Sequence, residues 1–234
     1  MVLPGGVQAG YIHIDGETIR AVYPNGASLP RLPVIEAGSG YVFPGLVDTH
    51  VHINEPGRTE WEGFTTATAA AAAGGITTLV DMPLNSDPVT TTTDAFRIKL
   101  DAARGKLSVD CGFHAGVVPG NATDLEPLID MGVLGAKAFM VYSGIAEFLN
   151  VGESDLRAAM PILARRGMPL LAHAEIDEKA PDLPSDDRRS YRRYLASRPS
   201  GWEVDAIGLL IRLCRETGCP VHVVHLATAE ALPM

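Results

Sequence analysis

The chain has 234 residues, with 19 Lys or Arg against 28 Asp or Glu and a formal net charge of −9. Hydrophobic residues make up 46%, which excludes a disordered chain, and an acidic balance without a run of cations argues against a nucleic-acid partner. No apolar stretch reaches the ~18 residues of a membrane span. We expect a cytoplasmic protein, because the first residues lack the features of a secretory signal and the three cysteines form no CxxC pair.

The expected elements begin with two short strands within residues 7–23, around an Asp-Gly turn. Pro and Gly punctuate residues 24–40, and from residue 41 strand-like and helix-like segments alternate. The expected strands are 41–53, 76–83, 109–118, 135–140, 169–175 and 220–227. The expected helices are 65–73, 92–105, 123–131, 154–167, 187–196 and 203–217.

Six strands, each but the last followed by a helix, are typical of βαβ units in a parallel sheet. An open doubly wound sheet and a (β/α)8 barrel are both compatible with this order. No GxGxxG motif follows the first strand, which removes the best sign of a dinucleotide-binding fold. A barrel takes ~250 residues and needs two further strand–helix units, so we expect the sequence to be truncated after the sixth strand.

Histidines end three of the expected strands. His50 and His52 end the first one, and a side-chain period of two puts both on one face, where they can share a metal ion. His173 and His225 end the fifth and sixth strands. Barrel active sites are built at the carboxyl ends of strands, so these positions predict a metal site. The other histidines are interpreted as structural, with His222 facing away from His225 to pack against helices: His13, His114 and His222.

Lys137 lies within GAKAFM, a strand expected to be buried on both faces, where an ammonium group is costly. Burial lowers a lysine pKa and yields a nucleophilic neutral amine. Such an amine can form a Schiff base with a carbonyl substrate, or it can take up CO2 to become a carbamate that bridges two metal ions. Nearby histidines favour the carbamate, and the Schiff base stays the main rival.

Several segments together resemble the cyclic amidohydrolases, the superfamily of dihydroorotases, hydantoinases and allantoinases. They are HVH at 50–52 after PGLVD, EPGRTEWEG at 55–63, AAAAAGGITTLVDMPLNS at 69–86, GAKAFM, HAE at 173–175 and VVHLATAEAL at 223–232. The resemblance implies an α/β protein with a TIM-type (β/α)8 metal-dependent hydrolase barrel. This chain would supply six of the eight strand units over residues 41–234, after part of a small β-sandwich over residues 1–40.

The resemblance also implies the roles of the site residues. His50 and His52 would bind one divalent ion, most often Zn²⁺, and His173 and His225 a second, with carboxylated Lys137 bridging them. A bridging hydroxide would attack the ring amide carbonyl. An aspartate on the eighth strand would complete the first ion's shell and move the proton, and this general base is absent from the chain.

Substrate charge separates the members of this superfamily. Dihydroorotate carries a carboxylate that needs a nearby cation, and Asn54 stands where dihydroorotases have an arginine. EPGRTEWEG, DMPLNS and SRPSGWEVDAI resemble allantoinases, which implies opening of the hydantoin ring of neutral allantoin, a cyclic ureide, to allantoate in purine catabolism. Asn85 and Tyr142 are candidate substrate contacts, although Asn85 can equally be a turn residue. Arg58 is expected to pair with Glu62.

Two alternatives remain open at this point. One is a hydantoinase or dihydropyrimidinase-type hydrolase, which shares the lysine segment including Tyr142. The other is an inactive, non-enzymatic fragment of the family, because the strand that would carry the aspartate is missing. For the full-length form the resemblance implies a homo-oligomer, a tetramer.

Overall fold

The computed structural model describes residues 1–177 and 189–234. The chain divides into two compact units, Met1–Leu46 and Val47–Met234. Within the described ranges, no helix is long and apolar enough to cross a membrane.

The smaller unit consists of two antiparallel ladders. The turn between the strands of the second ladder has Gly16 at φ 59°, a left-handed conformation that glycine adopts without strain. The predicted pair of strands around this turn is confirmed. The four strands are β1 (Val2–Leu3), β2 (Gly6–Val7), β3 (Gly10–Asp15) and β4 (Thr18–Pro24).

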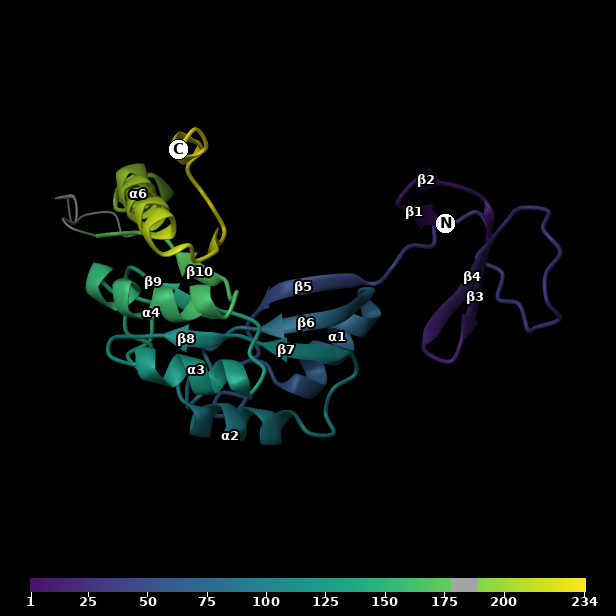
Figure 1. Ribbon diagram of the computed structural model, residues 1–234, viewed down its shortest axis with the longest axis horizontal. Helices are drawn as coiled ribbons and strands as arrows, with labels where there is room; N and C mark the ends of the chain where they lie inside the picture. Colours follow the sequence, from purple (N-terminus) through teal and green to yellow (C-terminus); the bar gives the residue numbers. More distant parts are fainter. Residues whose placement is uncertain (178–188) are drawn as a thin grey trace. The chain divides into compact units, whose positions relative to one another are not determined.

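The larger unit alternates strands with helices (Figure 1). The strands are β5 (Leu46–Val51), β6 (Ile76–Asp81), β7 (Asp110–Phe113), β8 (Ala115–Val117), β9 (Ala136–Phe139), β10 (Leu170–His173) and β11 (Val221–Val223). The helices are α1 (Phe64–Ala73), α2 (Thr93–Ala103), α3 (Ala122–Asp130), α4 (Glu153–Arg165), α5 (Tyr191–Ala196), α6 (Ser200–Thr217) and the short 3₁₀ turn η1 (Ala229–Ala231). The predicted alternation is confirmed, and the start of the predicted helix 187–196 lies outside the described residues.

The predicted strand 109–118 is interrupted at His114, which separates β7 from β8. The strand order is β5-β6-β7 in one sheet and β8-β9-β10-β11 in the other. The backbone N–H of His114 donates to Asp81 O on β6 at 2.9 Å, and that of Ala115 donates to Gly135 O before β9 at 2.9 Å. These two bonds link the sheets, so the strands follow one another in chain order.

Side chains alternate between two apolar clusters on the two faces of the second sheet. Ala136, Ala138 and Leu170 belong to the main core, which also includes the buried side chains of the helices. Lys137 and Leu171 are register partners on neighbouring strands and therefore share the opposite, inner face. Leu171 belongs there to a smaller cluster with Met82, Leu84, Val89, Phe148 and Val224.

Local sequence accounts for the ends of the helices. The side chain of Thr92 accepts the N–H of Ala95 and caps α2. Helix α6 ends at Gly218, whose φ of 72° is the left-handed conformation common after a helix. Gly218 thus ends α6 shortly before β11 begins at Val221.

Candidate metal centre

Lys137 occupies the middle of β9 and is fully buried on the inner face. Within the part of the chain that the structure describes, its Nζ has no hydrogen-bond partner. Its Nζ lies over the ring of Phe139, 4.7 Å from the ring centroid. Burial lowers the pKa of Lys137 to about 7, so much of the amine is neutral at neutral pH. The expected burial of this lysine is confirmed.

Four histidine rings form a row at the carboxyl ends of the strands. The ring centroids of His50 and His52 are 5.4 Å apart, and those of His50 and His225 are 5.5 Å apart. His173 continues the row, with its ring 4.7 Å from that of His225. The structure therefore brings together all four histidines that the sequence singled out.

Burial holds three of these imidazoles, those of His50, His173 and His225, in the neutral form that binds metals. Burial, followed by the charge of Lys137, lowers the pKa of His50 to about 4. Burial is also the main cause that lowers the pKa of His173 and of His225, and Lys137 lowers both further. Lys137 is thus electrostatically close to three of the four rings.

Hydrogen bonds fix which nitrogen of two rings is available. His52 Nδ1 lies 2.7 Å from Leu84 O. A carbonyl oxygen only accepts, so Nδ1 carries the proton and Nε2 keeps its lone pair. His173 Nε2 lies 2.7 Å from Glu175 Oε1, and Arg198 Nη1 donates to the other oxygen of Glu175 at 2.8 Å. This leaves Nδ1 of His173 as the free lone pair.

The donor set fits a pair of metal ions only if the lysine takes part. Among residues 1–177 and 189–234, no three His, Cys, Asp or Glu side chains converge closely enough to hold one ion. The buried amine of Lys137 has no partner of its own, and its charge lowers the pKa of three of the four rings. A ligand formed on Lys137 would supply what the histidines lack.

His225 follows β11 instead of ending it, and it has a φ of 41°, a left-handed conformation uncommon for a residue with a side chain. The interpretation of His222 is wrong. Its register partner is Leu171, so it lies on the inner face, where it is exposed. The alternation of side chains along a strand does not relate His222 to His225, because the strand ends at Val223.

A pocket of about 550 Å³ opens beside His173 and His225. Its wall includes Glu175, Arg198 and Glu203, so charged groups line part of it. The carboxylate of Glu203 accepts the backbone N–H groups of Ala227 and Thr228 at 2.9 and 2.8 Å. These two bonds anchor the loop that follows His225.

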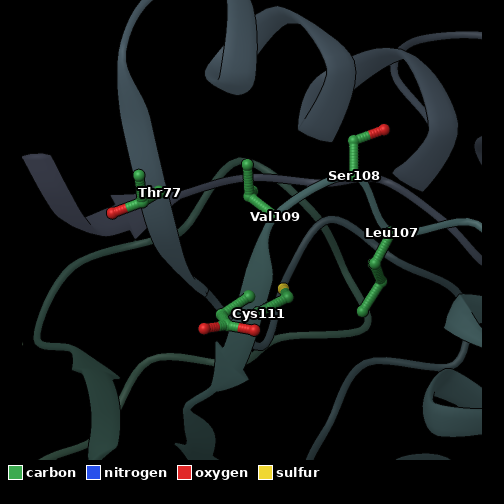
Figure 2. Close-up of a pocket in the computed structure, with 6 residues that line it drawn as sticks. Thr77, Leu107, Ser108, Val109 and Cys111 are labelled. Carbon is green, nitrogen blue, oxygen red and sulfur yellow. The ribbon is translucent and has the colours of Figure 1, made fainter. Parts of the chain in front are cut away.

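A second hollow lies at the opposite, amino ends of β6 and β7 (Figure 2) and is lined by Thr77, Leu107, Ser108, Val109, Asp110 and Cys111. Burial raises the pKa of Cys111 to about 12, so the thiol is not a nucleophile at neutral pH. The candidate chemistry therefore belongs to the carboxyl ends of the strands.

The candidate substrate contacts lie near the histidine row to different degrees. Asn85 Nδ2 donates to Asn54 Oδ1 at 3.2 Å, beside the strand end that carries His52. Tyr142 lies in the loop after β9 and is 59% exposed. The expected pair of Arg58 with Glu62 does not form.

Arg58 instead contacts residues distant in the chain. Its guanidinium donates to Asn85 O at 2.6 Å, pairs with Glu147 at 3.0 Å, and lies over the ring of Trp61. Glu62 is occupied at the start of α1, where its carboxylate accepts from Thr66 and from the N–H of Gly63.

Sequence reasoning missed Glu175, Glu203 and a buried ion pair between Asp81 and Lys99. Asp81 carried a usable signal, because an acidic residue at the end of the apolar strand ITTLVD needs a partner. Lys99 and Glu203 carried none, since both lie in helices where charged residues are ordinary.

Comparison with known proteins identifies the family. A family model described as "Amidohydrolase family" matches residues 41–183. The chain is 47% identical over 198 residues to an allantoinase of Saccharomyces cerevisiae, covering 82% of this chain and 43% of that protein. It is 45% identical over 235 residues to an allantoinase of Streptomyces avermitilis, covering 100% of this chain and 53% of that protein. It therefore spans about half the length of the curated relatives it matches.

The fold is also found in solved structures. An L-hydantoinase (dihydropyrimidinase) from Arthrobacter aurescens matches with a TM-score of 0.88 at 29% identity, over 97% of this chain and 51% of that one. The α/β architecture with parallel sheets is thus shared with a hydantoinase. Because the family model covers more than half of its residues, the chain belongs to the amidohydrolase family.

Proposed function

We propose that the protein is a metal-dependent cyclic amidohydrolase that opens the hydantoin ring of allantoin to allantoate. The observation that carries this proposal is the row of four imidazoles together with a buried lysine that has no hydrogen-bond partner. The choice of allantoin is supported by relatives named allantoinase at 47% and 45% identity. The hydantoinase with the similar fold is 29% identical.

The proposed metal ligands are His50 and His52 for one divalent ion and His173 and His225 for a second, with zinc as the metal. When bound, the two ions would polarise the ring carbonyl and activate water as a nucleophile at neutral pH. The chain's own contribution is to keep the imidazoles of His50, His173 and His225 unprotonated, and to set the tautomers of His52 and His173 through Leu84 O and Glu175.

Lys137 is proposed to carry a carbamate derived from CO2. Its neutral Nζ forms a bond to the carbon of CO2, one C–O π bond becomes a lone pair on oxygen, and the displaced proton leaves to solvent. The product is an anion with two oxygens at a position where Nζ now has no hydrogen-bond partner. An anion there can be shared between two ions, which a neutral amine cannot.

Asn85 and Tyr142 are proposed as contacts to the substrate, a small neutral cyclic ureide. The general base that the reaction needs, an aspartate by resemblance, is not among these 234 residues. We therefore propose that residues 41–234 supply six strands of an eight-stranded barrel, and that residues 1–40 supply part of a small β-sandwich. The complete protein is proposed to act in the cytoplasm as a homotetramer.

Side-by-side assays test the proposed substrate. The 234-residue chain and a longer protein that contains it are loaded with zinc and offered allantoin, hydantoin and dihydroorotate. The longer protein should hydrolyse allantoin fastest and dihydroorotate not at all, and the chain alone should bind zinc weakly without turnover. His50→Ala should abolish activity, whereas His222→Ala, a histidine on the same face outside the ligand set, should retain it. Preferred turnover of dihydroorotate would contradict the proposal, and preferred turnover of hydantoin would favour the hydantoinase alternative.

A further inference from the structure

A buried ion pair lies directly behind the strand end that carries the histidine pair. Lys99 Nζ on α2 donates to Asp81 Oδ2 at the end of β6 at 2.7 Å, and to Met82 O at 3.1 Å. The side chains of Lys99 and Asp81 are 1% and 0% exposed. Both charges are therefore removed from water and satisfied by each other and by the backbone.

The second carboxylate oxygen of Asp81 contacts the other strand. Asp81 Oδ1 accepts the backbone N–H of Ile53 at 2.7 Å. Ile53 is fully buried and directly follows His52. Its N–H has thus left the regular strand ladder and depends on a side chain for its hydrogen bond.

Two further bonds join the same segments. The N–H of Met82 donates to Val51 O at 2.8 Å, and His52 Nδ1 contacts Leu84 O at 2.7 Å. Residues 51–53 are therefore fixed to residues 81–84 at three successive positions. The link through Asp81 also reaches a helix, because Asp81 is paired with Lys99 on α2.

Stability alone does not explain a buried ion pair at this place. Replacing such a pair with apolar side chains of similar size is often neutral or stabilising, because the desolvation penalty of both charges disappears. An apolar pair, however, cannot accept the N–H of Ile53, and a buried N–H without a partner is costly. Asp81 is therefore needed to fix the position of the backbone next to His52.

We propose that Asp81 is a positioning residue that holds the His50–His52 segment in the geometry for binding metal, with Lys99 as the cation that keeps its carboxylate in place. This inference rests on the proposed function, because it takes His50 and His52 to be ligands. It assigns no contact with substrate to either residue.

Two double variants of the 234-residue chain separate the acceptor from the charges. Asp81→Asn/Lys99→Met removes both charges but keeps a carbonyl oxygen for Ile53. Asp81→Leu/Lys99→Met removes the charges and the acceptor. Leu128→Ala, in the fully buried part of α3, serves as a control for general destabilisation, and His50→Ala shows which part of the zinc affinity belongs to the histidine pair.

Two readouts are measured for each variant: zinc affinity by equilibrium dialysis, and hydrogen exchange of the Ile53 amide in metal-free protein. The Asn/Met variant should keep both near the wild-type values, as should Leu128→Ala. The Leu/Met variant should lose about 10–100-fold in zinc affinity, the usual range for groups that orient ligands, and its Ile53 amide should exchange faster. Asp81→Ala/Lys99→Met offers a smaller acceptor-free replacement if the leucine does not fold.

Several results would overturn the inference. One is a folded Leu/Met or Ala/Met variant with wild-type zinc affinity or with wild-type protection of Ile53. Another is a tenfold loss of zinc affinity in the Asn/Met variant, which decides the matter even if neither acceptor-free variant folds. If wild type and His50→Ala bind zinc equally, the proposed function fails, and the exchange of Ile53 still shows whether Asp81 positions this segment.

Discussion

Replacing the buried lysine with an apolar side chain should stabilise the metal-free chain at neutral pH. Methionine is the suitable replacement for Lys137, because its unbranched side chain fills similar space without a charge. Lys137 Nζ has no partner in the described structure, and burial lowers its pKa from 10.5 to about 7. The unfolded chain therefore binds a proton more tightly than the folded chain does.

The sign and size follow from this difference. A shift of one pKa unit corresponds to about 1.4 kcal/mol, so the lysine costs the folded state about 4–5 kcal/mol at and below pH 7. Between pH 7 and 10.5 the unfolded state holds the extra proton, and wild-type stability should rise by about 1.4 kcal/mol per pH unit. Lys137→Met should lack this slope, so its advantage should vanish near pH 10.5.

Urea unfolding at several pH values, with chelator present and CO2 excluded, measures this effect. Lys99→Met is the matched control, because Lys99 is equally buried but paired with Asp81. Its removal leaves a buried carboxylate unpaired and should destabilise the chain by about 3–5 kcal/mol. The reasoning is refuted if Lys137→Met destabilises the chain at pH 7, or if its difference from wild type does not change with pH.

Three further predictions concern the site and the thiols. Lys137→Ala should empty the zinc site, and added acetate or propionate should restore part of the zinc. Full zinc content in the variant would show that the lysine is only structural. An adduct of the wild-type chain with a carbonyl substrate, trapped by borohydride, would support the Schiff-base rival. Glu203→Ala should lower the free energy of unfolding by about 1–3 kcal/mol. It should also speed hydrogen exchange at Ala227 and Thr228, because their N–H groups lose their acceptor. Unchanged exchange at these amides would contradict the anchoring role of Glu203. Cys111 and Cys219, whose pKa values burial raises to about 12 and about 11, should resist iodoacetamide at pH 7.5 in the folded chain and react in urea, as mass spectrometry can follow.

The sequence predicts the site best where strand periodicity holds. Lys137 stands between two alanines that face the main core, so its place on the other face follows from alternation. The same reasoning brings His50 and His52 together, with rings 5.4 Å apart, although β5 ends at Val51 and His52 is the first residue after it. These positions need only local information, because a strand's side chains alternate whatever the rest of the fold does.

Prediction failed where the chain leaves regular structure or where the partner is distant. The predicted face of His222 was wrong because β11 ends at Val223 and the backbone turns at His225. The predicted partner of Arg58, Glu62, was wrong because the guanidinium of Arg58 pairs with Glu147, which is 89 positions away. No local pattern contains such a pair, since it depends on how loops from different strands meet.

The order of the site residues along the chain also fixes the order in which a ribosome releases them. The pair at 50–52 emerges first, and His225 emerges last. At about 5–20 residues per second, the two events are separated by roughly 10–35 s. During that time β5 and β6 can already pair through Val51 and Met82, which presents two adjacent imidazoles before their later neighbours exist. Cu²⁺ binds such nitrogen ligands more tightly than Zn²⁺ does, so if this pair is a metal site as proposed, the metal it takes up would depend on which ions are free in the cell during synthesis.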